Sequence, residues 1–174
     1  MTIKRKSSVS TRSLKGKGTG WFSGYSTTNL PLGGYAALVA LFTVGLASAF
    51  VASKQKAKHL PDLSATDLLL FSIATHKLSR IASKDLVTSP FRAPFVKFKA
   101  SAGAGEVEEK ARCEGLREAV GDLITCPYCM APWIAAALVF AAERAPRSTR
   151  VVSAIFNIAA DSDFLNRLYA RTKE

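Results

Sequence analysis

Cysteine is scarce in this chain, and the number of cysteines is odd. The three residues, Cys113, Cys126 and Cys129, cannot all pair with one another, so the sequence lacks the disulfide framework of a small secreted domain. Such cysteine usage is typical of a reducing compartment or of a membrane site that faces the cytosol. The 174 residues contain no internal repeat and no long low-complexity tract, and their number suits one domain.

Acidic residues are few, and residues 1–29 contain none. The chain has 24 Lys plus Arg against 13 Asp plus Glu, and its net charge of +11 indicates a polyanionic partner, either nucleic acid or an anionic membrane face. The mean hydropathy of +0.13 argues against a typical nucleic-acid-binding domain, and aromatic residues are nearly absent between the basic ones of the arm. We therefore predict that residues 1–29 are a disordered, solvated basic arm that sets the membrane topology, and we do not expect a nucleic-acid partner.

Charge of either sign is absent from residues 31–53, PLGGYAALVALFTVGLASAFVAS. This run has the length that a helix needs to cross a bilayer. A signal peptide is the alternative interpretation, but the preceding arm is long for an n-region and the apolar run is longer than a usual h-region. We expect an uncleaved transmembrane helix over residues 32–53, with the N-terminus in the cytoplasm.

Further helices are predicted downstream. Ser64 with Asp67 three residues later is a capping-box pattern that begins a helix over residues 65–83. Residues 126–142 carry no charge and predict a membrane helix over residues 124–142. The sequence also predicts a charged helix over residues 106–121, and a helix over residues 149–170 that either crosses the membrane or lies at its surface. Residues 30–174 are thus expected to form a single all-α, multi-pass membrane domain with three or four membrane helices.

The segment between Lys84 and Ala100 differs from these helices because Pro90 and Pro94 forbid a regular long helix. Aromatic and basic side chains alternate loosely within it. This pattern is typical of a segment in the headgroup layer, with rings toward the acyl chains and cations toward lipid phosphate. The candidate lipid-interface residues are Phe91, Phe95, Phe98, Lys97 and Lys99.

Ionisable side chains gather near the end of the helix predicted over residues 65–83 and beyond it. His76 and Arg80 are four residues apart and so share one helix face. Such side chains either snorkel to the membrane surface or form a functional cluster that faces the interior of the bundle on its cytoplasmic side. The candidate cluster consists of His76, Arg80, Lys84, Asp85, Arg92 and Asp122.

The CPYC stretch, residues 126–129, stands at the start of an apolar helix, where the helix dipole favours a thiolate. Two thiols supply half of a tetrahedral zinc or iron site, which Cys113 and either His59 or His76 would complete. A thiol–disulfide role needs no further ligand, but the flanks lack a thioredoxin-like βαβ pattern. In the third interpretation both cysteines only pack as small apolar residues. All three remain open, and the candidate metal ligands are Cys126, Cys129 and His76.

Several stretches together resemble a known family. THKLSR at residues 75–80, KDLVTSPFRAPF at residues 84–95 and GLREAVGDLITCPYC at residues 115–129, followed by Trp133, are similar to motifs of the bacterial membrane-protein family known as domain of unknown function 1360. The resemblance extends over about residues 30–174 and leaves out the basic arm. It implies a multi-pass protein of the bacterial plasma membrane with no established activity, and the family is also similar to a sporulation-associated protein of bacilli.

The chain departs from the family pattern at two places. Where the family often has GEL before the two cysteines, residues 121–123 are GDL, which keeps a carboxylate. Where many members have glycine after the second cysteine, residues 130–132 are MAP, which alters helix packing and leaves the thiols in place.

Signatures of catalysis are absent from the sequence. It contains no Gly-x-Ser-x-Gly, no His-Glu-x-x-His and no P-loop, and nothing places a nucleophile beside a base. We therefore expect a non-enzymatic accessory or scaffold factor of the bacterial envelope, whose partners are the bilayer, its anionic headgroups, and other membrane proteins or further copies of the chain. The alternative is a metal- or thiol-dependent membrane protein that acts on a lipid-linked anionic substrate held by Arg80 and Arg92.

Overall fold

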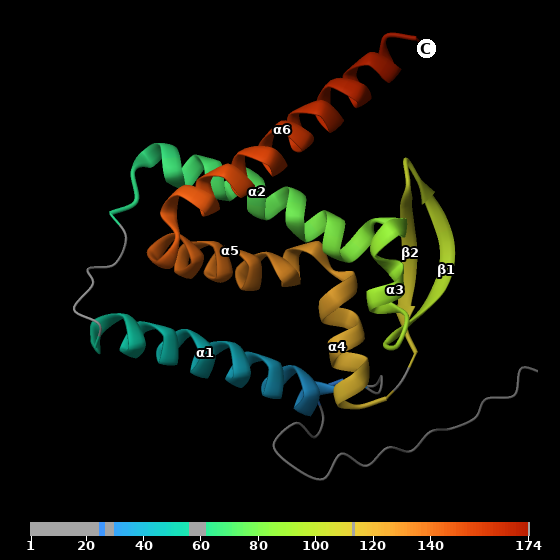
Figure 1. Cartoon of the computed structure of the whole chain (residues 1–174). Coiled ribbons are helices and arrows are strands. Elements are labelled where there is room, and N and C mark those ends of the chain that lie inside the picture. Colours follow the sequence, from blue (N-terminus) through green and yellow to red (C-terminus); the bar gives the residue numbers. More distant parts are fainter. Residues whose placement is uncertain (1–24, 27–29, 56–61, 113, 174) are drawn as a thin grey trace, which may run out of the picture.

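Four helices of 18 residues or more carry most of the part of the chain that the structure describes (Figure 1). The structure is a computed structural model, and it describes residues 25–26, 30–55, 62–112 and 114–173. The helices α1, α2 and α5 lie side by side, and α6 leaves the bundle obliquely toward its C-terminal end. Their bounds are Leu32–Gln55 for α1, Ala65–Lys84 for α2, Pro127–Arg144 for α5 and Pro146–Arg171 for α6, against predicted ranges of 32–53, 65–83, 124–142 and 149–170. The predicted arm, residues 1–29, lies outside the described residues except for residues 25–26.

The capping box predicted at the start of α2 is confirmed. The Ser64 hydroxyl accepts a hydrogen bond of 3.1 Å from the backbone N–H of Asp67, and the Asp67 carboxylate accepts one of 3.2 Å from the backbone N–H of Ser64. These two bonds satisfy donors that every helix leaves unpaired at its first turn. Arg150 of α6 adds an ion pair, in which Nε lies 2.7 Å from Oδ1 of Asp67, so the same carboxylate also joins α2 to α6.

The helix predicted over residues 106–121 is wrong in its first half. Residues Val96–Gly103 form strand β1, residues Glu106–Ala111 form strand β2, and only Leu116–Thr125 is helical, as α4. The strands pair antiparallel, with Val96 opposite Ala111 and Gly103 opposite Glu106. Between them, Ala104 and Gly105 have φ values of 48° and 77°, as a two-residue hairpin turn requires. The fold is therefore mostly helical with a small two-stranded sheet, and the predicted all-α class is corrected.

Tertiary contacts outweigh helix propensity in this hairpin. Glu, Lys and Ala dominate EVEEKA, and all three favour helix in isolation. In the folded chain, however, Val96 and Val107 are buried on one face of the hairpin. Glu106 and Glu109 of β2 form ion pairs with arginines of α2 and of the short helix α3, Ser89–Arg92. Burial and pairing of this kind decide strand formation more than local preference does.

The segment predicted to lie in the headgroup layer contains several short elements instead of one long helix, as its prolines indicate. They are the 3₁₀ helix η1 (Leu86–Thr88), α3 and the first part of β1. Phe91 is 82% exposed and Phe98 is 65% exposed, whereas Phe95 is half-buried. Lys97 and Lys99 are exposed. The exposure of these rings and amines is compatible with the predicted lipid contact, which stays a prediction.

Small residues occupy the interior, and large apolar residues lie outside. The buried side chains include Ser53, Ala74, Ser79, Ser83, Ala119, Ala142, Thr149 and Ser153, with Phe71 and Leu138 as the large members of the helix core. The exposed apolar side chains of α1 include Val39, Leu41, Val44, Phe50 and Val51. Those of α6 include Val151, Ile155, Ile158, Phe164, Leu165, Leu168 and Tyr169. Soluble proteins rarely expose apolar surface of this extent, and membrane helices use small residues where they meet one another.

The helices alternate in direction. The Phe42 and Trp133 rings lie 5.0 Å apart and those of Phe50 and Phe140 lie 5.6 Å apart, so α1 and α5 run parallel. The start of α2 meets the start of α6 through Asp67 and Arg150, and Lys77 lies 2.5 Å from Asp163 further along, so α2 and α6 also run parallel. One end of the bundle therefore holds the start of α1, the end of α2, the start of α5, α4 and the hairpin (Figure 1). We call it the α4 end.

Helix α4 crosses that end at an angle of 83° to α5. Gly34 allows α1 to approach α4 closely, because a Cβ at residue 34 would lie only 2.7 Å from the Cβ of Ala119. Among the described helices, α1 by itself is long and apolar enough to cross a bilayer, over Leu32–Ser53. Only 6% of the most apolar stretch of this helix is buried against the rest of the protein. The pair α4 and α5 meets the same criterion if the two are counted as one broken span.

Candidate functional site

A cavity of about 520 Å³ lies where α1, α4 and α5 meet at the α4 end. Its walls are mainly apolar, and its polar side chains include one tyrosine, one aspartate and the two cysteines of the CPYC stretch. A volume of this size suits a small molecule or part of a lipid. The lining residues are Tyr35, Leu38, Val39, Phe42, Ala119, Asp122, Leu123, Cys126, Cys129, Pro132 and Trp133.

The carboxylate in this cavity is held by a residue that the sequence analysis missed. The hydroxyl of Tyr35 on α1 donates a hydrogen bond of 2.6 Å to Oδ2 of Asp122 on α4. The two residues are 87 positions apart, and a tyrosine near the end of an apolar helix is usually an interfacial anchor. No local pattern therefore pointed to this pair. Within the part of the chain that the structure describes, Oδ1 of Asp122 accepts no hydrogen bond.

The two cysteines stand one helical turn apart at the start of α5. Cys126 is the N-cap residue, and its sulfur accepts a hydrogen bond of 3.2 Å from the backbone N–H of Cys129. Pro127 follows at the first helical position, where its missing N–H costs nothing. Both thiols are free, Cys126 half-buried and Cys129 exposed. Cys126 thus caps the helix and also lines the cavity.

The described residues do not assemble the predicted metal site. Over residues 25–26, 30–55, 62–112 and 114–173, no three or more His, Cys, Asp or Glu side chains are grouped closely enough to hold a metal ion. His76 is exposed on α2 and is not among the residues that line the cavity. Cys113 and His59, the other suggested ligands, lie outside the described residues. Zinc or iron at Cys126 and Cys129 therefore remains a prediction, for which the described residues supply two of the four ligands.

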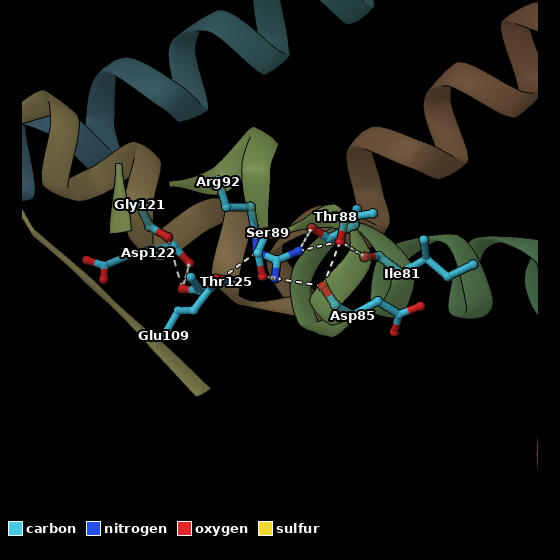
Figure 2. A network of polar contacts seen from close by, with 10 residues as sticks. Ile81, Asp85, Thr88, Ser89, Arg92, Glu109, Gly121, Asp122 and Thr125 are labelled. Atoms are coloured by element: carbon cyan, nitrogen blue, oxygen red, sulfur yellow. Dashed lines mark hydrogen bonds and ion pairs between the residues drawn. The ribbon is translucent and has the colours of Figure 1, made fainter. Parts of the chain in front are cut away.

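The predicted polar cluster separates into distinct groups, and the most buried member is Arg92. Figure 2 shows its polar contacts. Nε of Arg92 donates to Oε2 of Glu109 at 2.5 Å, and these side chains are only 3% and 4% exposed. Nη1 donates to the backbone oxygen of Ala82 and to Oγ1 of Thr88, and Nη2 donates to the backbone oxygen of Asp85 and to Oγ of Ser89. All five N–H groups of the guanidinium are thus used, so Arg92 ties the end of α2 to α3 and β2 and has no donor left for a ligand.

Arg80 is occupied in a similar way. Its Nη2 donates to both carboxylate oxygens of Glu106, with a distance of 2.6 Å to Oε2. Arg167 of α6 approaches the same carboxylate at 3.8 Å. Glu106 therefore joins α2, β2 and α6. Neither Glu106 nor Glu109 belongs to the predicted cluster, because both lie in a segment for which the sequence predicts a helix.

The remaining members lie apart. Asp85 takes part through its backbone, which bridges to Glu106 and accepts from Arg92. Lys84 is half-buried near the carboxylate of Glu108. Asp122 belongs to the cavity with Tyr35 and the cysteines. The structure thus brings Arg80, Asp85 and Arg92 together along strand β2, between the turn and the middle of the hairpin. It places Asp122 in the cavity and leaves His76 exposed on α2.

Fold and site together define a small helical protein with an apolar outer surface, a hairpin at one end of its bundle, and a cavity that contains one carboxylate and two thiols. Residues 70–169 match the family described as Protein of unknown function (DUF1360). The chain belongs to this family. The matched residues run from the first half of α2 to the end of α6, so they begin later than residue 30, where the resemblance was expected to start. They include Asp122 and both cysteines, and they leave out α1 with Tyr35.

No curated protein and no solved structure matches the chain.

Proposed function

We propose that the chain is a multi-pass protein of a bacterial plasma membrane that acts as a non-enzymatic accessory or scaffold factor. The observation that carries this proposal is the distribution of side chains, with small residues between the helices and large apolar residues on the outer faces of α1 and α6. In water such a surface would be unfavourable by about 25 cal/mol for each Å² of apolar area, whereas in a lipid bilayer it is solvated.

The alternating helix directions support a topology with both ends of the chain on one side. If α2 and α6 cross the bilayer together with α1 and α5, the start of α1 and the end of α6 both lie at the α4 end. The arm carries Lys and Arg but no acid, and positive charge is retained on the cytoplasmic side. The α4 end, with the hairpin and the cavity, is then cytoplasmic.

The pairing of charges supports a non-enzymatic role. Arg80 and Arg92, the residues suggested to hold a lipid-linked anionic substrate, have Glu106 and Glu109 as partners within the chain. Their charges are therefore neutralised by the fold. The alternative, a thiol- or metal-dependent protein, is favoured by the two thiols in the cavity. Such a protein would act through Cys126 and Cys129 and would not use the two arginines.

Membrane extraction tests the proposed location. We expect the full chain to remain in the membrane pellet after an alkaline carbonate wash and to need detergent for release, because α1 is too apolar to leave the bilayer. A peripheral protein of the same cells, released by the same wash, is the control. A chain that appears in the supernatant and runs as a monomer without detergent would contradict the proposal.

The sidedness of the cavity is tested by thiol labelling. In a variant with Cys113→Ser and Cys126→Ser, the exposed Cys129 is the remaining thiol. A membrane-impermeant maleimide should label it in inverted vesicles and not in intact spheroplasts. Labelling of spheroplasts alone would place the α4 end outside the cytoplasm.

A further inference from the structure

We infer that the cavity of α1, α4 and α5 is a binding site for a single-chain amphiphile with a protonated amine as its head, taken from the membrane leaflet at the α4 end. The membrane as the source of the ligand rests on the proposed function. The site itself rests on the shape and the charge of the cavity.

The shape favours a hydrocarbon chain. A second cavity of about 150 Å³ lies further along α1 and α5, lined by residues that include Gly45, Ala49 and Ala137. Phe42 and Trp133 line both cavities, and their rings lie 5.0 Å apart. The two cavities therefore follow one another along the parallel helices α1 and α5, and together they form a groove.

The groove is longer than the hydrocarbon of one leaflet is deep, so it can hold a chain that spans the leaflet. From Tyr35 to Ala49 along α1 the helical rise amounts to about 21 Å, and the hydrocarbon of one leaflet is about 15 Å deep. Phe140 lines the smaller cavity, and its edge-to-face contact with Phe50 lies at the far end of the groove. A chain that enters beside Asp122 thus has apolar contacts along its whole length.

The charge favours a cationic head. Among the described residues that line the larger cavity, Asp122 is the one that is charged, and none is a lysine or an arginine. Oδ2 of Asp122 is fixed by the Tyr35 hydroxyl at 2.6 Å, and Oδ1 has no donor within the part of the chain that the structure describes. Glu118, one turn earlier on α4, lies near enough to act electrostatically on Tyr35. An ammonium group at Oδ1 gains a charge-assisted hydrogen bond there, whereas a carboxylate or phosphate would be repelled.

Quenching of tryptophan fluorescence tests the site. The chain has two tryptophans, Trp21 and Trp133, so Trp21→Phe leaves only the one that lines the groove. The probes are a long-chain primary amine, the fatty acid and the alcohol of the same chain length, each brominated near the end of its chain. They are titrated into the full chain in a non-ionic detergent.

We expect saturable quenching by the amine with an apparent Kd about tenfold lower than that of the fatty acid or the alcohol, because a hydrogen bond to a charged group is worth about that factor. Asp122→Asn should make the amine and the alcohol bind alike. Equal and non-saturating quenching by all three probes in the parent protein would show partition into the micelle only and would overturn the inference. That comparison needs no variant at residue 122 to fold.

Two substitutions on α1 test the path of the chain. Gly45 lines the smaller cavity and has open space at its Cβ position, so Gly45→Phe should fill the groove and raise the apparent Kd of all three probes at least about tenfold. Gly33 on the same helix also has open space but lines neither cavity, and Gly33→Phe should leave binding unchanged. Unchanged binding in Gly45→Phe would exclude the groove as the site. These titrations are made in micelles, so a negative result would contradict the amine site alone. A negative result in the membrane extraction would contradict the proposed location of the protein.

Discussion

Replacing Arg92 by methionine should lower the free energy of unfolding by about 3–5 kcal/mol, the cost of leaving one member of a buried ion pair without its partner. The side chains of Arg92 and Glu109 are 3% and 4% exposed, so the remaining carboxylate could not recover its hydration. The variant also loses four hydrogen bonds from the guanidinium to the end of α2, η1 and α3. The measurement is an unfolding curve in mixed detergent micelles, with protein level in cells as a second readout.

The same hairpin offers a matched control for this prediction. Lys99 and Glu108 form a pair at 2.9 Å that is more than half exposed, and Lys99 lowers the pKa of the Glu108 carboxyl mainly by donating a hydrogen bond to it. Lys99→Met should change the stability by less than about 1 kcal/mol. The double variant Arg92→Met with Glu109→Met should recover part of the loss, since no buried charge remains. A loss in Arg92→Met no greater than in Lys99→Met would show that the buried network does not stabilise the fold.

Replacing Gly34 by leucine should separate α1 from α4 and lower the stability by about 1–3 kcal/mol, the usual range for overpacking. A Cβ at residue 34 would lie 2.7 Å from the Cβ of Ala119 and 3.1 Å from the backbone oxygen of Gly115. Neither of these atoms is the end of a flexible side chain, so the helices must move apart. The loss is measured as the shift of the unfolding midpoint in mixed micelles.

Two comparisons make the Gly34 prediction specific. Gly33→Leu changes the neighbouring residue, where nothing lies within 4 Å of the Cβ position, and it should have little effect. In the second comparison, the double variant Gly34→Ala with Ala119→Gly moves the methyl group from α4 to α1. It should lose less stability than the two single variants lose in sum. Strict additivity of the two changes would mean that α1 and α4 do not contact each other at these residues.

The sequence predicts an element well when the residues that stabilise it lie within or beside that element. Helix α1 was predictable because residues 31–53 carry no charge, and the start of α2 because Ser64 and Asp67 cap it through bonds three residues apart. The hairpin was not, because its strand β2 is rich in helix-forming residues and is held by Arg80 and Arg92 from outside it. The helix propensity of these residues amounts to a few tenths of a kcal/mol each, whereas a buried carboxylate that loses its partner costs about 3–5 kcal/mol.

The candidate site shows the same limit. The sequence predicts Asp122 as a member of the polar cluster and Cys126 and Cys129 as candidate metal ligands, and the structure places these three residues around one cavity. Tyr35 was not recognised, because its contact with Asp122 joins residues 87 positions apart. The sequence predicts that Arg92 is available to a ligand, but its five N–H donors are used within the fold. Four of the acceptors lie outside its own short helix, so the sequence around Arg92 does not reveal them.

The central claim is that the apolar outer faces of α1 and α6 lie in the lipid bilayer. The most direct test measures whether spin labels on these faces are in contact with lipid. Spin labels at Val44 of α1 and Ile158 of α6, which are exposed apolar positions, would be compared in bilayers with a label at Lys97 of the hairpin, in a background with all three cysteines replaced by serine. The account predicts that oxygen, which concentrates in lipid, relaxes the labels at residues 44 and 158 more than a water-soluble nickel complex does, and that the order is reversed at residue 97. Access of the nickel complex to residues 44 and 158 equal to its access to residue 97 would contradict the account, because the large apolar side chains would then face water.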